Sequence, residues 1–195
     1  MLESYGLLGF FRLFINVVLT RIFYSKSRLV RFPFRVRGGK YIDFGVGLTT
    51  GVNCRMDAFP VHNKACLFFG ENVQINDFVH IGAIDSVRIG NDVLIASKVF
   101  ISDHNHGFYG LDGEHTDPDI KPLVRRLSSS PVSIEDNVWI GESVSILPGV
   151  TIGKGSIIGA NSVVTRNIDA YTIAVGVPAK VVKKFDFASK KWVSA

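Results

Sequence analysis

The stretch of sequence between residues 134 and 169 repeats every six residues. An aliphatic residue recurs at each sixth position, namely Ile134, Ile140, Ile146, Ile152, Ile158 and Val164. A second series of small or β-branched residues follows four positions behind, namely Val138, Val144, Val150, Ser156, Ser162 and Ile168. An α-helix would space its apolar residues three and four apart, and a simple strand would alternate by two. The period of six therefore predicts a β-helix, in which short strands and tight turns stack into one continuous core.

The same period runs through residues 42–101 in shorter blocks. Its inward positions are predicted to be Ile42, Leu48, Cys54, Phe69, Ile75, Ile81, Ile89, Ile95 and Ile101. A loop over residues 59–65 and two extra residues around Asp85 separate the blocks. Burial of one aliphatic side chain stabilises the folded state by about 1.5–3 kcal/mol. We therefore expect these columns to make the largest contribution to the stability of the fold.

The repeat stops at Ser102 and resumes at Ser133. The intervening segment is polar and opens with Asp103, His104, Asn105 and His106 in succession. An insertion of this length in a regular solenoid is generally functional or disordered. Two histidines beside a carboxylate offer acid–base chemistry where the regularity ends, so we predict a functional loop.

Composition restricts the class of protein. At 195 residues the chain forms one ordinary domain with short additions. Its net charge of +5 is moderate, and the Lys and Arg residues form no tract of the kind that binds nucleic acid. Two cysteines, Cys54 and Cys66, are too few for a disulfide framework or a zinc cluster. A protein of the reducing cytosol fits these features.

The N-terminal segment from Leu7 to Tyr24 is strongly apolar. Arg12 and Arg21 interrupt it, so the uncharged run is shorter than the ~20 residues that a membrane span needs. Glu3 stands where a signal peptide would carry basic residues, and no small-residue cleavage site follows. The segment is therefore predicted to be a helix that does not span the membrane.

On a helical wheel this segment has a narrow polar stripe formed by Gly9, Arg12, Asn16 and Thr20, with a wide apolar face opposite. We expect an amphipathic helix that packs on the body of the protein or on a neighbouring subunit. The functional alternative is peripheral contact with the cytoplasmic membrane surface, assisted by basic residues nearby. Those residues are Arg21, Lys26, Arg28 and Arg31.

Three segments follow from these patterns. Residues 1–39 form the helix and an extended lead-in, residues 40–183 form the β-helix, and residues 184–195 form a short basic tail. The sequence Gly176-Val177-Pro178 is expected to end the solenoid. The lysines that follow it predict a short solvated helix.

Several motifs together carry a family resemblance. They are VWIG at 138–141, PGVTIG at 148–153, IGANSVVT at 158–165 and GVPAK at 176–180. They resemble the hexapeptide-repeat acyltransferases, in particular the galactoside, maltose and xenobiotic acetyltransferases. The segment ISDHNHG at 101–107, together with the N-terminal helix, is similar to the lipopolysaccharide O-antigen O-acetyltransferases. The resemblance implies an all-β, left-handed parallel β-helix of three hexapeptides per coil, assembled as a homotrimer.

The family transfers an acetyl group from acetyl-CoA to a hydroxyl, at sites between adjacent subunits. A sugar hydroxyl is a weak nucleophile, so a general base is needed, and histidine suits the task because its pKa lies near neutral pH. In relatives the base stands five residues after an inward aliphatic and follows an asparagine, which corresponds to His106 after Asn105. A shift in the alignment would make His104 the base instead. Asp103 is expected to orient one of the two imidazoles.

The resemblance also supplies candidate contacts to the carbohydrate acceptor. Asn76 matches an asparagine that touches the acceptor near the reacting centre. It is interpreted equally well as a turn asparagine whose side chain hydrogen-bonds its own backbone. Asp85 lies near an acidic acceptor-binding position, with the register displaced by one residue. Trp139 occupies an outward position in its repeat, where it would line the site or a subunit interface.

Acetyl-CoA is the expected co-substrate, and no metal is expected. The matching positions are Gly141, Glu142, Ala160, Thr165, Arg166, Lys180 and Lys183. Relatives carry a small polar residue in place of Glu142, so only its backbone is expected to take part. Cationic side chains are suited to this ligand because the phosphates of CoA are anionic.

Alternatives remain open at this point. The acceptor could be the amine of a nucleotide-linked amino sugar, since an amine needs the same base. A zinc enzyme of similar architecture would need three suitably spaced ligands, whereas His104 and His106 are only two apart. A non-catalytic scaffold would leave the paired histidines unexplained. We therefore predict a cytoplasmic, or peripheral inner-membrane, acetyl-CoA-dependent O-acetyltransferase that acts on a surface polysaccharide or its precursor.

Overall fold

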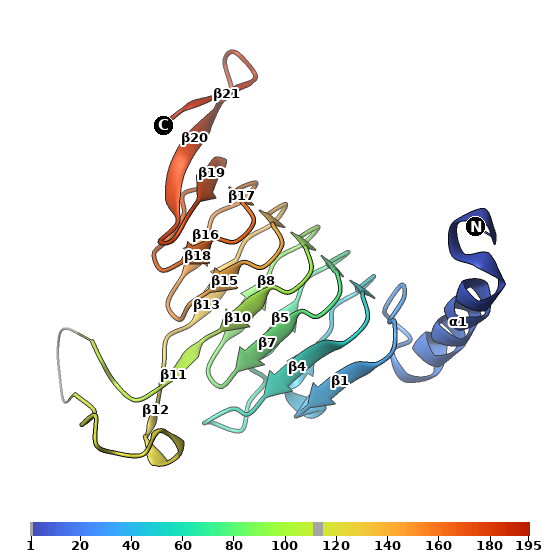
Figure 1. Cartoon of the computed structure of the whole chain (residues 1–195), viewed down its shortest axis with the longest axis horizontal. Helices are drawn as coiled ribbons and strands as arrows, with labels where there is room; N and C mark the ends of the chain where they lie inside the picture. Colours follow the sequence, from blue (N-terminus) through green and yellow to red (C-terminus); the bar gives the residue numbers. More distant parts are fainter. Residues whose placement is uncertain (1, 111–114) are drawn as a thin grey trace.

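The computed structural model of the chain describes residues 2–110 and 115–195. Short strands stack into a three-sided prism, with a helix at the N-terminal end and a β-hairpin at the C-terminal end (Figure 1). Helix α1 spans Leu2–Phe23, and Gly6 interrupts its helical geometry with a φ of 62°. The prism confirms the β-helix that the period of six predicts.

Three sheets form the sides of the prism, and within it neighbouring strands are parallel. The six-stranded sheet contains β1 (Phe34–Arg37), β4 (Cys54–Ala58), β7 (His80–Ala83), β10 (Phe100–Ser102), β15 (Ser145–Ile146) and β18 (Val163–Val164). The five-stranded sheet contains β2 (Ile42–Asp43), β5 (Leu67–Phe69), β8 (Val87–Ile89), β13 (Val132–Ile134) and β16 (Thr151–Ile152).

The eight-stranded sheet forms the third side and extends into the C-terminal hairpin. It contains β3 (Thr49–Thr50), β6 (Gln74–Ile75), β9 (Leu94–Ile95), β14 (Trp139–Ile140), β17 (Ile157–Ile158), β19 (Thr172–Val175), β20 (Lys180–Asp186) and β21 (Lys191–Ser194). The chain visits the five-, eight- and six-stranded sheets in turn, so one circuit of three repeats makes one coil. Two 3₁₀ turns, η1 (Gly39–Tyr41) and η2 (Pro122–Val124), lie outside the sheets.

The predicted columns of aliphatic residues form the core. Ile81 pairs with Ile101, and Ile101 with Ile146, so identical side chains stack from coil to coil. Nearly all predicted inward residues are buried, from Leu48 and Cys54 to Val164. Ile42 is only partly buried, because it lies in the first coil and has a neighbouring coil on one side only.

Asparagines make several of the tight corners between sheets. Asn53, Asn72, Asn137 and Asn161 all have a positive φ, of 57°, 56°, 59° and 59° respectively. Asparagine tolerates this left-handed conformation better than other residues with a side chain. Its recurrence next to the aliphatic columns is therefore part of what makes the six-residue repeat turn.

The C-terminal segment differs from its prediction. Lys183 and Lys184 lie in strand β20, and Lys191 begins β21, so this segment is an antiparallel hairpin and the predicted solvated helix is wrong. Aromatic side chains hold the hairpin together, with Phe185 against Trp192 at a ring-centroid distance of 5.2 Å. Residues separated by a turn form this contact, which the lysine spacing alone does not reveal.

Candidate active site

The inserted loop leaves the prism where β10 ends, at the edge between the six- and five-stranded sheets, and projects away from it (Figure 1). At its base, β11 (His104–His106) pairs antiparallel with β12 (Leu127–Ser129). His104 lies opposite Ser129, and His106 lies opposite Leu127. The segment predicted to be functional therefore begins as a short, ordered ribbon that carries both imidazoles.

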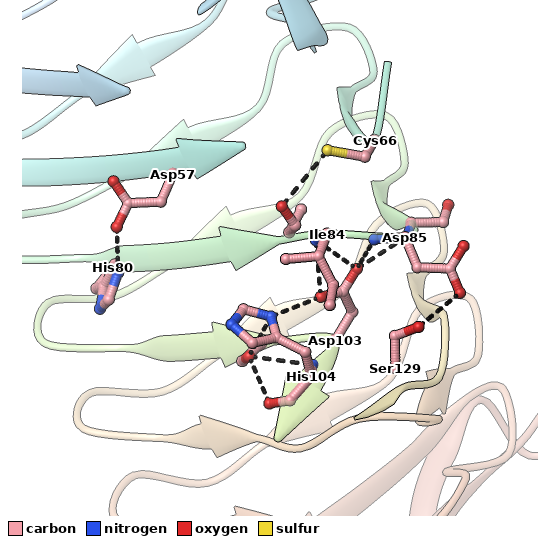
Figure 2. Close-up of polar contacts among 11 residues, drawn as sticks. Asp57, Cys66, His80, Ile84, Asp85, Asp103, His104 and Ser129 are labelled. Atoms are coloured by element: carbon pink, nitrogen blue, oxygen red, sulfur yellow. Dashed lines mark hydrogen bonds and ion pairs between the residues drawn. The ribbon is translucent and has the colours of Figure 1, made fainter. Parts of the chain in front are cut away.

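Asp103 is completely buried at the start of this ribbon. Its carboxylate accepts hydrogen bonds from the backbone N–H groups of Ile84, Asp85 and Ser86, at 3.0, 2.8 and 2.8 Å. Those residues form the irregularity that displaces the repeat by two positions. The carboxylate therefore stabilises a backbone bend in the preceding coil (Figure 2).

The same carboxylate orients His104. Its Oδ1 lies 2.9 Å from Nδ1 of His104, and the Oγ of Ser102 lies 3.2 Å from the same nitrogen. Because a carboxylate can only accept, Nδ1 carries the proton in this pairing, and in the neutral ring Nε2 then has the free lone pair. The ring lies beside Gly82, where a Cβ would come within 3.3 Å of Cε1 of His104. His104 is thus a half-buried imidazole in the tautomer of a base.

His106 is exposed on the ribbon, two residues further along. Its Nδ1 lies 3.2 Å from the carbonyl oxygen of Pro122, which again assigns a proton to Nδ1 and, in the neutral ring, the lone pair to Nε2. The hydroxyl of Tyr109 donates to the carbonyl of His106 at 2.6 Å, and Arg125 donates to that hydroxyl at 2.9 Å. The loop therefore holds this imidazole in place while leaving it open to solvent.

A cavity of about 690 Å³ borders the ribbon on the side of β12. Its lining includes Phe108, His115, Arg125, Arg126 and Ser129. The mixture of aromatic, hydroxyl and guanidinium groups can contact both the apolar faces and the hydroxyls of a sugar. His115, which the sequence left without a role, lies in this wall.

The candidate acceptor residues fall into two groups. Asn105 and Asp85 lie at the same edge of the prism as the imidazoles, and the Oγ of Ser129 donates to the Asp85 carboxylate at 3.3 Å. Asn76 follows β6, at the edge between the eight- and six-stranded sheets. Trp139 stands 49% exposed on β14 in the eight-stranded sheet, which agrees with its predicted outward position.

The predicted CoA contacts are divided in the same way. Thr165 and Arg166 follow β18 at the edge that carries the loop, whereas Gly141, Glu142 and Ala160 lie at the other edge. Gly141 is constrained there, since a Cβ would lie 2.6 Å from the backbone nitrogen of Ala160. Lys98 forms an ion pair with Glu142 at 3.0 Å. Lys180 and Lys183 are exposed on β20.

A polar cluster beside the loop was missed by the sequence analysis. Asp57 is 5% exposed and lies 2.6 Å from Arg37 Nε, 2.7 Å from Arg55 Nε and 3.1 Å from His80 Nε2. Burial alone would raise the pKa of Asp57, but the hydrogen bonds and charges of these partners lower it overall. Asp57 pairs in register with Gly82, and the ring of His104 lies beside Gly82, so the six-stranded sheet that carries the cluster also borders the base of the loop. Figure 2 shows Asp57 and His80 on that sheet, apart from the group formed by Asp103 and His104. The sequence signal that could have revealed this cluster is that two charged residues, Arg37 and Asp57, each directly follow an inward-facing residue of their strand.

Among residues 2–110 and 115–195, no three His, Cys, Asp or Glu side chains are grouped to hold a metal ion. Both cysteines are free and buried. The two imidazoles of the ribbon can transfer protons, and β12 of the same ribbon lines a cavity with both polar and apolar walls.

Comparisons with known proteins agree with this fold. Residues 131–166 match the bacterial transferase hexapeptide (six repeats) family. The chain is 49% identical over 193 residues, 99% of its length, to the Escherichia coli K12 protein named "Putative lipopolysaccharide biosynthesis O-acetyl transferase WbbJ", of which the match covers 97%. The hexapeptide-repeat containing acetyltransferase VCA0836 of Vibrio cholerae is 26% identical, with a TM-score of 0.53 and coverage of 94% and 92% of the two chains.

Two further structures extend the comparison. VCA0836 complexed with acetyl coenzyme A gives a TM-score of 0.50 at 25% identity, over 94% of this chain and 88% of that one. The N-acyltransferase AntD of Bacillus cereus, at 20% identity, shares the fold with a TM-score of 0.68 over 88% and 90% of the chains. The β-helix, together with the 49% identity to WbbJ over nearly the whole length of both chains, shows an acyltransferase of the hexapeptide-repeat class. Within that class this chain belongs to the hexapeptide-repeat acetyltransferases.

Proposed function

We propose that this enzyme transfers the acetyl group of acetyl-CoA to a hydroxyl of a sugar in a surface polysaccharide or in its precursor. The observation that carries the proposal is the exposed imidazole of His106, held through Nδ1 on a ribbon whose other strand, β12, lines a cavity with both polar and apolar walls. The name of the relative that is 49% identical supports the acceptor class.

In the proposed reaction, Nε2 of His106 removes the proton from the sugar hydroxyl. The alkoxide oxygen attacks the thioester carbonyl, a new C–O bond forms, and the C–S bond then breaks. The imidazolium returns the proton to the departing CoA thiolate, which restores neutral His106. A backbone or side-chain donor near the carbonyl oxygen stabilises the tetrahedral intermediate.

His104 plays the supporting part in this scheme. Its ring is half-buried and fixed by Asp103 and Ser102, so it reaches solvent less freely than His106. We assign it to acceptor contact and to the orientation of the ribbon. It is the rival for the role of base, because its tautomer is equally suitable.

The division of the candidate residues between two edges of the prism supports a trimer. One edge carries the imidazoles, Thr165 and Arg166, and the other carries Asn76, Gly141 and Ala160. Two edges of one prism cannot enclose the same small ligand, because the packed core lies between them. Adjacent copies around a three-fold axis would bring one edge of each subunit together, so the proposed acetyl-CoA site lies between subunits.

The enzyme is proposed to work in the cytoplasm, where acetyl-CoA is available, and peripherally at the inner face of the cytoplasmic membrane. The N-terminal helix is proposed to make the membrane contact. Its exposed apolar side chains and the basic residues after it support this location.

The decisive experiment measures release of the CoA thiol from acetyl-CoA with a panel of sugars and oligosaccharide repeat units. We expect one sugar class to accelerate release, and His106→Ala to reduce kcat by roughly 10²–10⁴-fold with an unchanged melting temperature. His62→Ala, an exposed loop histidine, is the matched control and should retain full activity.

Other outcomes distinguish the alternatives. If His104→Ala abolishes turnover while His106→Ala does not, His104 is the base. If neither substitution matters, the proposed mechanism is wrong. Preferential acetylation of nucleotide-linked amino sugars in the same panel would replace the O-acetyltransferase assignment by an N-acetyltransferase.

A further inference from the structure

Helix α1 is attached to the prism by its polar side. The N–H of Val30 donates to Oγ1 of Thr20 at 2.8 Å, and the N–H of Phe32 donates to Oδ1 of Asn16 at 3.1 Å. Both side chains are buried, at 1% and 5% exposure. Arg12 adds a hydrogen bond to the carbonyl of Phe32 at 3.2 Å. Three successive turns of the helix are therefore bonded to the segment that leads into β1.

The apolar face of α1 consequently points away from the protein. Its large side chains are from 40% to 88% exposed and comprise Leu7, Leu8, Phe10, Phe11, Phe14, Ile15, Val17, Val18, Ile22 and Phe23. A helix on a soluble domain normally turns this face to the core. An apolar patch of this extent marks a surface that binds another surface. We call these ten residues the α1 apolar face.

From residue 4 to residue 42 all the charged residues are basic, although Arg37 is paired with Asp57 of the first coil. Residues 4–42 contain eight Lys and Arg residues and no Asp or Glu, whereas acidic residues outnumber basic ones in the rest of the chain. The basic residues are Arg12, Arg21, Lys26, Arg28, Arg31, Arg35, Arg37 and Lys40. They lie on α1, on the lead-in and on the first coil, at the opposite end of the prism from the C-terminal hairpin (Figure 1).

The α1 apolar face could be covered by a second copy of the chain or by a lipid bilayer, and the charge of the basic residues distinguishes between the two. A second copy of the same segment would bring like charges together, which opposes association. A bilayer with anionic headgroups would instead attract the basic residues while its acyl chains cover the α1 apolar face. The combination of apolar and cationic groups therefore matches an anionic lipid surface.

The same contacts determine how the helix lies. By length and composition alone, Gly6–Phe23 is apolar enough to cross a membrane, with a mean hydropathy of 1.7. However, the uninterrupted part from Leu7 to Phe23 is about 25 Å long at 1.5 Å per residue, shorter than a hydrocarbon core of about 30 Å. Its polar side is also bonded to the prism through Asn16 and Thr20. A helix fixed in this way can lie in the interface but cannot span it.

We propose that α1 is an in-plane membrane anchor, whose α1 apolar face inserts among the lipids of an anionic bilayer while its polar stripe holds the prism. The proposal rests on the peripheral location assigned to the enzyme and specifies the surface, the orientation and the lipid charge. It places the first coil, and not the C-terminal hairpin, next to the membrane.

The test is cosedimentation of the full chain with vesicles of phosphatidylcholine, with and without phosphatidylglycerol. We expect tight binding to the anionic vesicles, weak binding to the neutral ones, and weaker binding at high salt because the charges are screened. The variant Leu7→Ser/Phe11→Ser/Phe14→Ser should lower the vesicle affinity by roughly tenfold or more. Arg21→Glu/Lys26→Glu should lower it on anionic vesicles only.

The matched control is Val61→Ser/Phe187→Ser/Val193→Ser, which replaces three exposed apolar residues outside α1 and should bind like the wild type. Failure of the wild type to bind anionic vesicles, or equal binding by the α1 variant, overturns the proposal. Dissociation of the oligomer in the α1 variant, without vesicle binding by the wild type, would identify a neighbouring copy as the occupant. Thiol release with a soluble acceptor is measured in parallel, and its absence would contradict the proposed function without affecting the anchor.

Discussion

The carboxylate of Asp103 lies 2.9 Å from Nδ1 of His104 while it also accepts hydrogen bonds from the backbone N–H groups of the preceding coil. One buried group thus fixes both the bend at residues 84–86 and the first imidazole of the loop. In Asp103→Asn, the side-chain amide N–H groups would face backbone N–H groups that need an acceptor. Each buried N–H group left without an acceptor lowers the free energy of unfolding by about 1–3 kcal/mol. We expect a lower midpoint of urea denaturation together with a lower kcat for acetyl transfer.

The control for Asp103 is Asp85→Asn. The Asp85 residue is exposed, and its carboxylate accepts one hydrogen bond, from Ser129. This variant should keep the wild-type denaturation midpoint. If Asp103→Asn also keeps it, the bend does not depend on the buried carboxylate, and the link between coil and loop is wrong.

The period of six was sufficient to predict the prism because burial at these positions depends on repetition alone. Ile146 is inward because every coil places an aliphatic residue there, and Trp139 is outward because it precedes such a position. The loop could be located by the same logic, as the place where repetition fails. The resemblance supplied the candidate roles of His104 and His106, and the structure adds their Nδ1 partners, Asp103 and Pro122.

The remaining features depend on contacts that periodicity does not encode. The helical wheel identified Asn16 and Thr20 as a polar stripe, but not that residues 30–32 offer backbone groups to it. The cluster around Asp57 joins residues from successive coils, so it appears only when the register of the strands is known. The C-terminal hairpin depends on aromatic contacts such as Phe185 with Trp192.

The Asp57 cluster gives a pH dependence with a defined sign. Burial raises the pKa of Asp57, but its partners Arg37, His80 and Arg55 outweigh this and lower it below the usual value. A carboxyl group with a lower pKa in the folded state stabilises the protein above its unfolded pKa, about 3.9. This stabilisation is lost as the pH falls through the lower folded value.

Asp57→Asn should therefore be less stable than the wild type at pH 7, and the difference should shrink in acid as Asp57 becomes protonated. Urea denaturation at pH 7 and at pH 3 measures both quantities. Asp119→Asn, an exposed loop carboxylate, is the control and should show no difference at either pH. A stability difference that is independent of pH would mean that packing, and not charge, is what Asp57 contributes.

The two cysteines should be unreactive in the folded enzyme. Burial raises the pKa of Cys54 and of Cys66 to about 11, from a reference value of 9.0. The thiolate is the reactive form, so at pH 8 the folded protein should react with a thiol reagent only as fast as it unfolds. The same shift makes stability depend on pH. Because the pKa of both thiols is higher in the folded state than in the unfolded state, their contribution to the free energy of unfolding is complete below pH 9 and is lost as the pH rises toward 11.

Ser189→Cys supplies the positive control for labelling, because residue 189 is exposed in the C-terminal hairpin. Its added thiol should react within the mixing time while the two native thiols remain protected. Rapid labelling of the unmodified protein under native conditions would show that one of the coils opens locally at Cys54 or Cys66.

The inward and outward positions of one repeat should differ sharply in their effect on stability. Ile146 is fully buried and lies in register with Ile101 and Val164 of the adjoining coils. Ile146→Ala removes this stacking from both sides and should cost about 2–5 kcal/mol in the free energy of unfolding. Ile157→Ala is the matched control, because Ile157 is only partly buried on the outer side of β17.

Urea denaturation at several protein concentrations measures both variants, and the Ile157→Ala loss should be clearly smaller at every concentration. Equal losses that do not vary with concentration would contradict the inward column as the source of stability. A loss for Ile157→Ala that grows on dilution would instead identify the outer side of β17 as a contact between copies of the chain.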